Sequence, residues 1–321
     1  MINLKKKSVY LDFVKVLKQN PIIVIFFVFF VIFSFLYTRK FLSTMNLQAI
    51  LGQFVTLMLF ALGPSIVMVI GELDLSYVGI WMLGGIIVWM LTPVLGLFSI
   101  LVFPLLGLVT GTFIGFVHTK TKIPVFILTL SLLVTYWGLT SQLSGGYPRA
   151  TEKFGFITAD IIPYIPTVLF WTIPLIIFAI YLMKFTKIGT YLYAIGSNEE
   201  GAKLAGINVK KYKMLAFVIS GIFTGLSTII LFQHLGGSVP VELNLDTMVN
   251  PLVAIVLGGT PLTGGSGGPH KTIFGALTFS VITRGLNISA LHPTTIQLFI
   301  GILLIIAIVI SARGMKGVEV T

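Results

Sequence analysis

The sequence contains no cysteine and few charged residues. Its 321 residues include 21 Lys and Arg and only 10 Asp and Glu. The absence of cysteine excludes disulfide bonds, zinc–thiolate sites and cysteine nucleophiles. Charged residues make up 10% of the chain, whereas a soluble globular domain carries roughly 25%. So low a charge content excludes a water-soluble protein with an ordinary charged surface.

Apolar residues are correspondingly abundant. Hydrophobic residues form 56% of the chain and the mean hydropathy is +1.03. Because a spanning helix needs about 20 mostly apolar residues, the pattern predicts an all-α polytopic membrane protein with about ten transmembrane helices in a single domain, 1–321. The short run 247–259 predicts a half-helix or a re-entrant segment. The apolar runs are 21–37, 48–70, 77–92, 94–117, 124–144, 167–183, 214–235, 247–259, 273–291 and 294–311.

Basic residues orient these runs. The first run ends in Tyr37-Thr38-Arg39-Lys40 rather than in a small-residue cleavage site, so we interpret it as a helix and not as a signal peptide. With residues 1–20 in the cytoplasm, sixteen of the 21 Lys and Arg residues fall on the inner side, four on the outer side and Arg284 inside a run. Such a bias is typical of cytoplasmic loops. It predicts that both termini are cytoplasmic, and it explains the basic charge without nucleic acid binding.

Two glycine-rich patterns test whether the chain is an enzyme. Residues 264–268 match G-x-S-x-G, but the required strand before the serine is absent from this apolar context. Residues 265–272 nearly match a Walker A loop, with His270 in place of the glycine before the lysine and Pro269 removing a backbone donor. We therefore predict no catalytic residue and no nucleotide site in this chain. The histidines, His118, His234, His270 and His292, lack the spacing of metal ligands.

Polar residues interrupt the apolar runs at two places. Glu72 and Asp74 break the stretch 54–92, and a charge at the bilayer centre costs about 2.5–3.5 kcal/mol on insertion scales. They are either solvated at a helix end or part of a broken helix that lines a translocation path, which we favour. Arg284 either extends to the outer surface or faces the bundle interior with Asn287. Glu72, Asp74, Arg284 and Asn287 are thus the predicted path residues.

A weak internal correspondence links two acidic segments. GELDLS (71–76) and VELNLD (241–246) each precede an apolar run that ends near a glycine pair. The positions of the apolar runs place the two segments on opposite sides of the membrane. This pattern is typical of an inverted internal repeat, and chance similarity between two short acidic loops is the alternative.

The inner loop 184–213 contains a helix start signal. Ser197 is followed three residues later by Glu200, which predicts a capping box, and Gly206 is placed to end the helix. This short helix is either a plain connection or a docking element for a cytoplasmic partner. The residues assigned to it are Ser197, Asn198, Glu199, Glu200, Ala202, Lys203, Leu204, Ala205 and Gly206.

The same loop carries a family resemblance. GTYLYAIGSNEEGAKLAGINV (189–209) resembles the corresponding stretch in the ribose, galactose and xylose permeases of binding-protein-dependent ABC importers. Four further segments, 71–85, 123–140, 242–267 and 274–287, are similar to this family in the same order. Glu72 stands where the family usually has a small or aliphatic residue, and Arg284 where a neutral polar residue is expected.

The resemblance implies a monosaccharide importer permease of the vitamin-B12-importer (type II) fold in the bacterial cytoplasmic membrane. It implies a second permease subunit, identical or paralogous, an extracytoplasmic sugar-binding protein, and a cytoplasmic ATPase that binds ATP and Mg²⁺, with no cofactor in this chain. Segment 197–206 would be the coupling helix to that ATPase. The alternatives are a permease for a furanosyl signalling molecule or a nucleoside, and an ion-coupled secondary transporter.

Overall fold

The protein is almost entirely helical in the computed structural model, which describes residues 21–121, 123–151 and 166–314. The strands are β1 (Arg149–Ala150) and β2 (Ser238–Val239), which pair antiparallel. The helices are α2 (Pro21–Leu36), α3 (Thr38–Phe41), α4 (Thr44–Met68), α5 (Ser76–Leu95), the 3₁₀ helix η1 (Gly96–Leu101), α6 (Val102–Thr121), α7 (Val125–Ser144), α9 (Val168–Phe185), α10 (Lys187–Ser197), α11 (Glu199–Leu204), α12 (Val209–His234), α13 (Leu245–Leu257), α14 (Pro269–Ile288) and α15 (Pro293–Gly314).

Every predicted apolar run contains a helix, so the predicted all-α class is confirmed. Within the described residues, five helical stretches are long and apolar enough to cross a membrane. One of them, Ser76–Thr121, is divided by η1 into α5 and α6. The others are Thr44–Met68, Val125–Ser144, Val168–Phe185 and Val209–His234, and three shorter apolar helices are Ile22–Leu36, Leu245–Leu257 and Pro293–Ile306.

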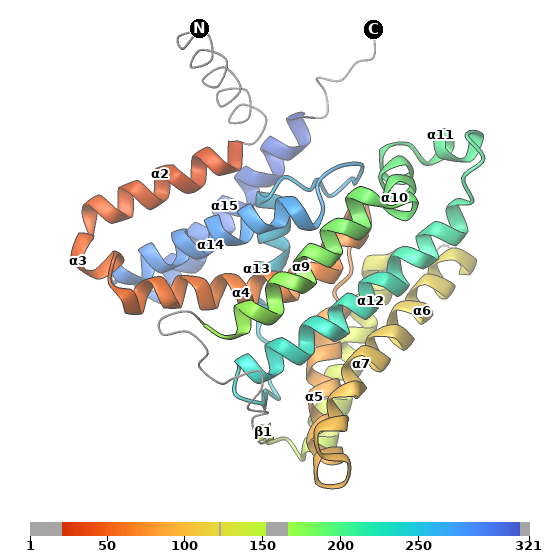
Figure 1. The fold of residues 1–321 in the computed structure, drawn as a ribbon, viewed down its shortest axis with the longest axis horizontal. Helices are drawn as coiled ribbons and strands as arrows, with labels where there is room; N and C mark the ends of the chain where they lie inside the picture. The colour runs from red at the N-terminus through yellow and green to blue at the C-terminus, as the bar shows by residue number, and fades with distance from the viewer. Residues whose placement is uncertain (1–20, 122, 152–165, 315–321) are drawn as a thin grey trace, which may run out of the picture.

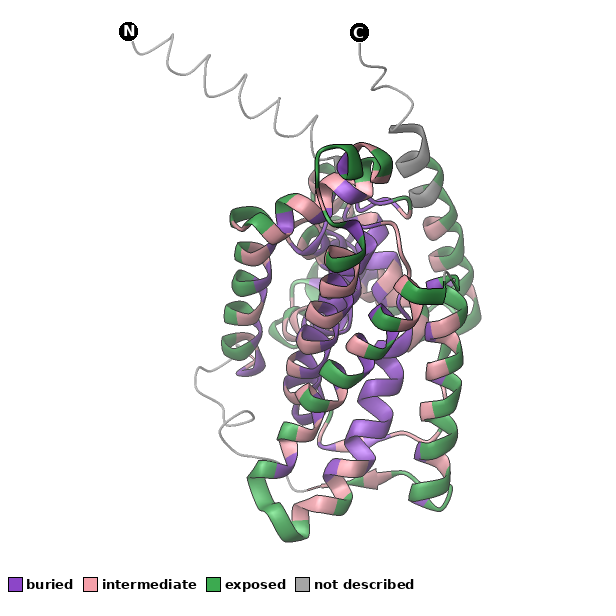
Figure 2. Cartoon of the chain, turned by 90° about the vertical axis from the view of Figure 1, so that its right-hand side faces the viewer, coloured by how far each residue is buried: buried purple, intermediate pink, exposed green. Residues whose placement is uncertain are grey.

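Helices α4 and α12 form the centre of the molecule. In their most apolar windows 78% and 67% of residues are buried, compared with 22–33% in the other three candidate spans. Figure 2 shows buried residues gathered on central helices and exposed residues on the outer ones. Large apolar side chains such as Phe35, Val94 and Phe98 are exposed on this periphery. A soluble monomer rarely exposes so much apolar surface, but a lipid-facing surface requires it.

Glycines allow α6 and α12 to cross closely. Gly107 and Gly111 on α6 face Gly221 and Phe217 on α12, where an added Cβ would collide with backbone oxygens. Small residues four apart are a common means of helix approach in membranes. This crossing fixes the start of α12 beside the end of α6, where the candidate site lies.

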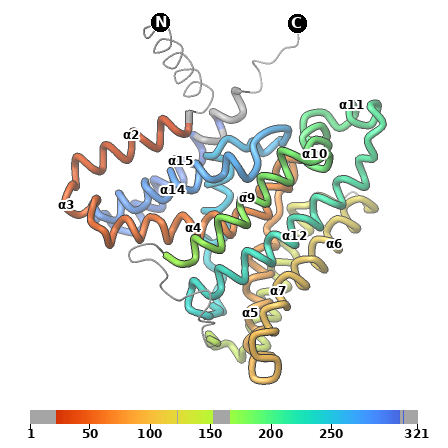
Figure 3. The backbone as a smooth tube through the Cα atoms, in the orientation of Figure 1, coloured from red at the N-terminus to blue at the C-terminus, as the bar shows by residue number. Residues whose placement is uncertain are grey.

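The connecting segments gather at two opposite ends. Figure 1 shows α11, the start of α2 and the end of α15 along one side, which we call the α11 end, and α3 and β1 away from it. The tube in Figure 3 follows the same path, with α12 running from α11 toward the strands. The predicted inner loop 184–213 therefore lies at the same end of the fold as the start of α2 and the end of α15.

Helix α13 covers only part of the bilayer thickness. Its 13 residues rise about 20 Å, less than the roughly 30 Å of a hydrocarbon core. The chain before α13 is not helical, and Trp137 Nε1, seven residues before the end of α7, donates a 2.7 Å hydrogen bond to Val241 O. Segment 240–244 thus enters beside the interior of α7 before α13 begins. This geometry agrees with the predicted half-helix or re-entrant segment.

Candidate functional site

Helix α11 is a short helix with defined caps at both ends. Asn198 is its N-cap, with Oδ1 accepting from Gly201 N at 2.9 Å. At the other end Gly206 N donates to Lys203 O and Ile207 N to Ala202 O, both at 3.0 Å. Gly206 has φ +81°, so this is a Schellman closure that favours glycine. The predicted closing role of Gly206 is confirmed.

The predicted capping box is wrong by one residue. Ser197 is the last residue of α10, and its Oγ donates to Gly265 O at 3.3 Å instead of accepting from Glu200. Asn198 has the extended backbone that an N-cap needs. Helix α10 itself was not predicted, although its buried residues, Gly189, Leu192 and Ile195, recur at every third position, as one face of a helix requires.

One face of α11 is exposed. Ala202 is buried against the bundle, whereas Glu200, Lys203 and Ala205 are exposed. Leu204 is 90% exposed, which is unusual for a leucine beside a capped helix end. The helix therefore presents an acidic, a basic and an apolar side chain on a small projection at the end of the molecule.

Glycine contacts join α10, the end of α4 and the loop 258–268. Gly196 lies against Val69 O and Gly265 N, so that an added Cβ would overlap both. Gly265 N donates to Val69 O at 2.8 Å, and Tyr193 Oη donates to Gly267 O at 2.7 Å. Burial raises the pKa of Tyr193 to about 12. This glycine-rich loop is therefore tightly packed against α10 and the end of α4.

The positive φ angles of this loop explain its glycines. Four glycines of the loop have φ between +80° and +94°, and Gly259 at its start has φ +92°. Residues with a Cβ rarely adopt this region. A nucleotide-binding loop is therefore not needed to explain the sequence. The four loop positions are Gly264, Gly265, Gly267 and Gly268.

Glu72 belongs to a cluster of ion pairs beside α11. Its Oε1 lies 3.5 Å from Lys213 Nζ and 3.2 Å from His118 Nε2. Lys213 Nζ also lies 2.8 Å from Glu199 Oε2, and Lys203 Nζ lies 3.1 Å from Glu199 Oε1. The hydrogen bond from Lys213 lowers the pKa of Glu199. Glu199 therefore keeps its negative charge to a lower pH than it would without Lys213.

Asp74 has a local structural role. Its Oδ1 accepts from the backbone N–H of Ser76 at 2.8 Å and from the Ser76 hydroxyl at 2.6 Å, so that it shapes the turn into α5. Burial raises its pKa although these hydrogen bonds oppose the change. Asn244 Oδ1 accepts from Asp246 N at 2.8 Å in the same way at the start of α13. The two segments of the predicted repeat therefore share one turn geometry.

The structure does not bring the four predicted path residues together. Glu72 and Asp74 lie in the α4–α5 loop, whereas Arg284 and Asn287 lie in the last two turns of α14. Asn287 is exposed, and the Nε atom of Arg284 is buried without a hydrogen bond among the described residues.

Three polar residues before and within the first turn of α13 are exposed and were not among the predicted path residues. Glu242, Asn244 and Asp246 are exposed and lie near the depth of Trp137 in α7. Charged groups at such depth face water or protein rather than lipid. The acidic repeat segment was the only sequence signal for them, because their position beside α7 depends on the long-range contact between Trp137 and Val241.

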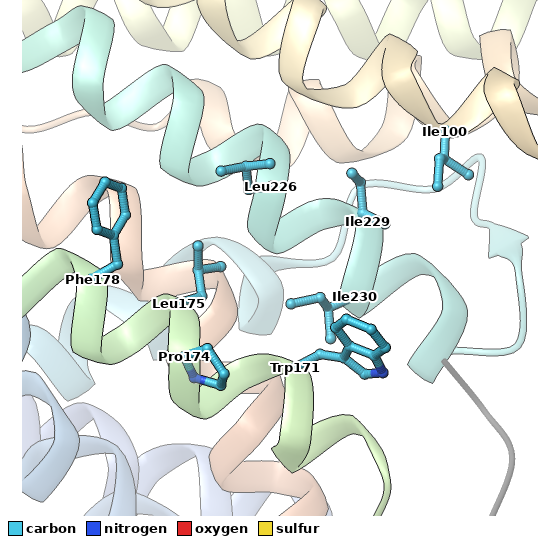
Figure 4. Close-up of a pocket in the computed structure, with 8 residues that line it drawn as sticks. All are labelled: Ile100, Trp171, Pro174, Leu175, Phe178, Leu226, Ile229 and Ile230. Atoms are coloured by element: carbon cyan, nitrogen blue, oxygen red, sulfur yellow. The ribbon is translucent and has the colours of Figure 1, made fainter. Parts of the chain in front are cut away.

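A groove of about 390 Å³ between α9 and α12 is a different kind of site. Figure 4 shows apolar side chains converging on it from both helices. No carboxylate, amide or hydroxyl is among its lining residues, so it suits an acyl chain and not a sugar. It is lined by residues including Trp171, Leu175, Phe178, Leu226, Ile229 and Ile230.

Comparison with known proteins assigns the chain. Residues 46–308 match the family described as branched-chain amino acid transport system / permease component. The chain belongs to this family. It is 33% identical to the ribose import permease of Haemophilus influenzae over 259 residues, covering 77% of this chain and 79% of that protein.

Other relatives have different cargoes in their names. The xylose/arabinose import permease of Sulfolobus acidocaldarius is 26% identical over 91% of this chain and 82% of its own length. The autoinducer 2 import permease of Yersinia pseudotuberculosis is 29% identical over 88% of this chain and 81% of its own length. No solved structure matches the chain. Family membership and the apolar helices together identify a multi-pass membrane protein of a permease family.

Proposed function

We propose that the chain is the permease subunit of an ATP-binding cassette importer that carries a monosaccharide across the bacterial cytoplasmic membrane. The observation that carries this proposal is the 33% identity to a ribose import permease over 77% of the chain. The xylose/arabinose relative supports the same substrate class. The importer would hydrolyse ATP in a separate subunit, so this chain is a transporter component and not an enzyme.

The ATPase would dock on α11. The exposed side chains of Glu200, Lys203 and Leu204 offer a compact contact that the permease itself does not use. ATP and Mg²⁺ would belong to that ATPase, with no cofactor in this chain. An extracytoplasmic binding protein would deliver the sugar at the opposite end, near β1 and β2.

The fold would be a type II importer permease with about ten transmembrane helices and both termini in the cytoplasm. The helices found in every predicted run and the shared end of the inner loops support this arrangement (Figure 1). The matching Asx turns at Asp74 and Asn244 support an inverted repeat. A second permease subunit would complete the transporter, because one chain leaves polar groups of α13 exposed beside the bilayer.

The translocation path would run along α7 and the start of α13. Glu242, Asn244 and Asp246 would offer carboxylate and amide groups to sugar hydroxyls, and Trp137 an aromatic edge nearby. Arg284 and Asn287 would lie toward the outer mouth. Glu72 and Asp74 would contribute by holding the broken connection between α4 and α5.

Autoinducer 2 is the competing cargo, because the chain is 29% identical to an autoinducer 2 import permease. Uptake of labelled ribose, xylose and autoinducer 2 into cells that express the whole importer separates the two. We expect uptake of a pentose, competed by excess of the same unlabelled sugar. Uptake of autoinducer 2 alone would replace the sugar assignment but keep the importer class.

A further inference from the structure

Lys213 is shared by two carboxylates from different parts of the chain. Its Nζ lies 2.8 Å from Glu199 on α11 and 3.5 Å from Glu72 in the α4–α5 loop. Glu72 and Lys213 are separated by 141 positions in the sequence. His118, in the last turn of α6, closes the cluster on the other side of Glu72.

Three of the four groups in the cluster are sheltered from solvent. The side chains of Lys213, Glu72 and His118 are 16%, 20% and 14% exposed. Fully exposed ion pairs contribute little, because water and salt screen them. When a pair is sheltered, removal of one member leaves the other charge poorly compensated. Glu72 therefore has a strong reason to stay with Lys213, whereas Glu199, which is 41% exposed, is held by the shorter 2.8 Å contact.

The cluster continues into the region of the exposed polar residues. From Glu72 the chain passes through the Asp74–Ser76 turn into α5, where Tyr77 Oη donates a 2.6 Å hydrogen bond to Met248 O in the first turns of α13. Direct contacts thus run from α11 through Lys213 to the segment that carries Asp246.

We propose that Lys213 is a positioning residue that fastens α11 to the α4–α5 loop through Glu199 and Glu72. A displacement of α11 then moves the start of α5, instead of being absorbed in the short connection 205–208 between α11 and α12. The source of that displacement rests on the proposed function, but the fastening itself belongs to the permease alone.

Amide hydrogen exchange of the purified full-length permease tests the fastening without any partner. Lys213→Met is expected to speed exchange roughly tenfold in both 199–206 and 71–76, because one sheltered cation serves both segments. Glu72→Gln is expected to speed exchange in 199–206, and Glu199→Gln in 71–76. Lys210→Met is the matched control, since Lys210 is exposed three residues earlier on the same helix.

Lys213→Arg is the control for a general loss of folding. It keeps the cation and is expected to retain slow exchange in both segments. The proposal is overturned if Glu72→Gln and Glu199→Gln each affect only their own segment. It is also overturned if Lys213→Met behaves like Lys210→Met.

Transport measurements test the functional consequence. The quantity measured is the uptake per ATP hydrolysed in proteoliposomes that contain the permease with its ATPase and binding protein. Lys213→Met is expected to lower this ratio severalfold, while Lys213→Arg and Lys210→Met keep it. If the native permease shows no ATP-dependent uptake, the proposed function fails and the exchange experiment still decides the fastening. If native uptake is ATP-dependent and Lys213→Met keeps both the native ratio and native exchange, the fastening is wrong.

Discussion

Tyr77 Oη donates a 2.6 Å hydrogen bond to Met248 O, which joins the first turns of α5 and α13. Each of these helices follows one of the two acidic segments of the predicted repeat, and each begins with the same Asx turn. The hydroxyl of Tyr77 therefore lies at the meeting point of two broken connections. The hydrogen bond holds the start of α5 against the first turns of α13.

Tyr77→Phe is expected to lower the free energy of unfolding by about 1 kcal/mol, because a buried hydrogen bond is removed without loss of ring packing. Denaturant titration of the purified protein in detergent measures the change. Tyr147→Phe is the control, since Tyr147 is 70% exposed. Equal midpoints for the two variants would contradict the proposed strength of the Tyr77 contact.

The surface of α11 is tested by Glu200→Lys. Glu200 is exposed, so the substitution is expected to leave the fold intact while it reverses a charge that the ATPase would meet. We expect ATP hydrolysis to continue and sugar uptake to fall severalfold. Glu200→Gln is expected to have a smaller effect, and normal uptake by Glu200→Lys would remove α11 from the docking surface.

Gly206→Pro tests the closure of the same helix. Proline fixes φ near −65° and lacks an N–H, whereas Gly206 has φ +81° and donates to Lys203 O. The helix end is expected to unfold locally and uptake to be lost, with the rest of the protein folded. Exchange of the amides in 199–206 measures the local effect, and unchanged exchange with full uptake would contradict it.

Close packing at Gly196 makes a separate prediction about stability. A Cβ there would overlap Val69 O and lie 2.6 Å from Gly265 N, so Gly196→Ala is expected to cost about 1–3 kcal/mol. Gly301→Ala places the same methyl group in open space and serves as the control. Thermal unfolding in detergent compares the two, and a similar midpoint would show that the glycine junction is not tightly packed.

Features of the fold that depend on neighbouring residues in the sequence were predicted, and features that depend on residues far apart in the sequence were not. Apolar runs are local, and they located every long helix. Gly206 was predicted as a helix end because the Schellman closure depends on neighbouring residues. Asn198 was missed as the N-cap because the choice between it and Ser197 depends on Gly265, which is 68 positions away from Ser197.

The candidate site was predicted only in part for the same reason. Glu72 was recognised as unusual, but its partners His118 and Lys213 come from α6 and α12 and are adjacent only after the helices cross. Asp246 was not chosen because the course of 240–246 beside α7 depends on contacts such as that of Trp137 with Val241. Residues whose role depends on depth in the membrane need the fold before they can be assigned.

Asp246 is expected to contribute directly to uptake. Hydrogen bonds to a charged group contribute about 1.5–3 kcal/mol, so Asp246→Asn is expected to reduce sugar uptake roughly tenfold or more at limiting sugar concentration. Asp246→Glu keeps the carboxylate and is expected to retain most of the uptake. If Asp246→Asn transports like the native protein, the path does not pass this residue.

The source of energy for uptake tests the central claim most directly. Proteoliposomes containing the permease are prepared with and without its ATPase and binding protein, with ATP or ADP at the nucleotide-binding side, and with or without ion gradients. We expect labelled pentose uptake only when both partners and ATP are present, whatever the ion gradient. Uptake by the permease alone, driven by an ion gradient, would contradict the importer assignment.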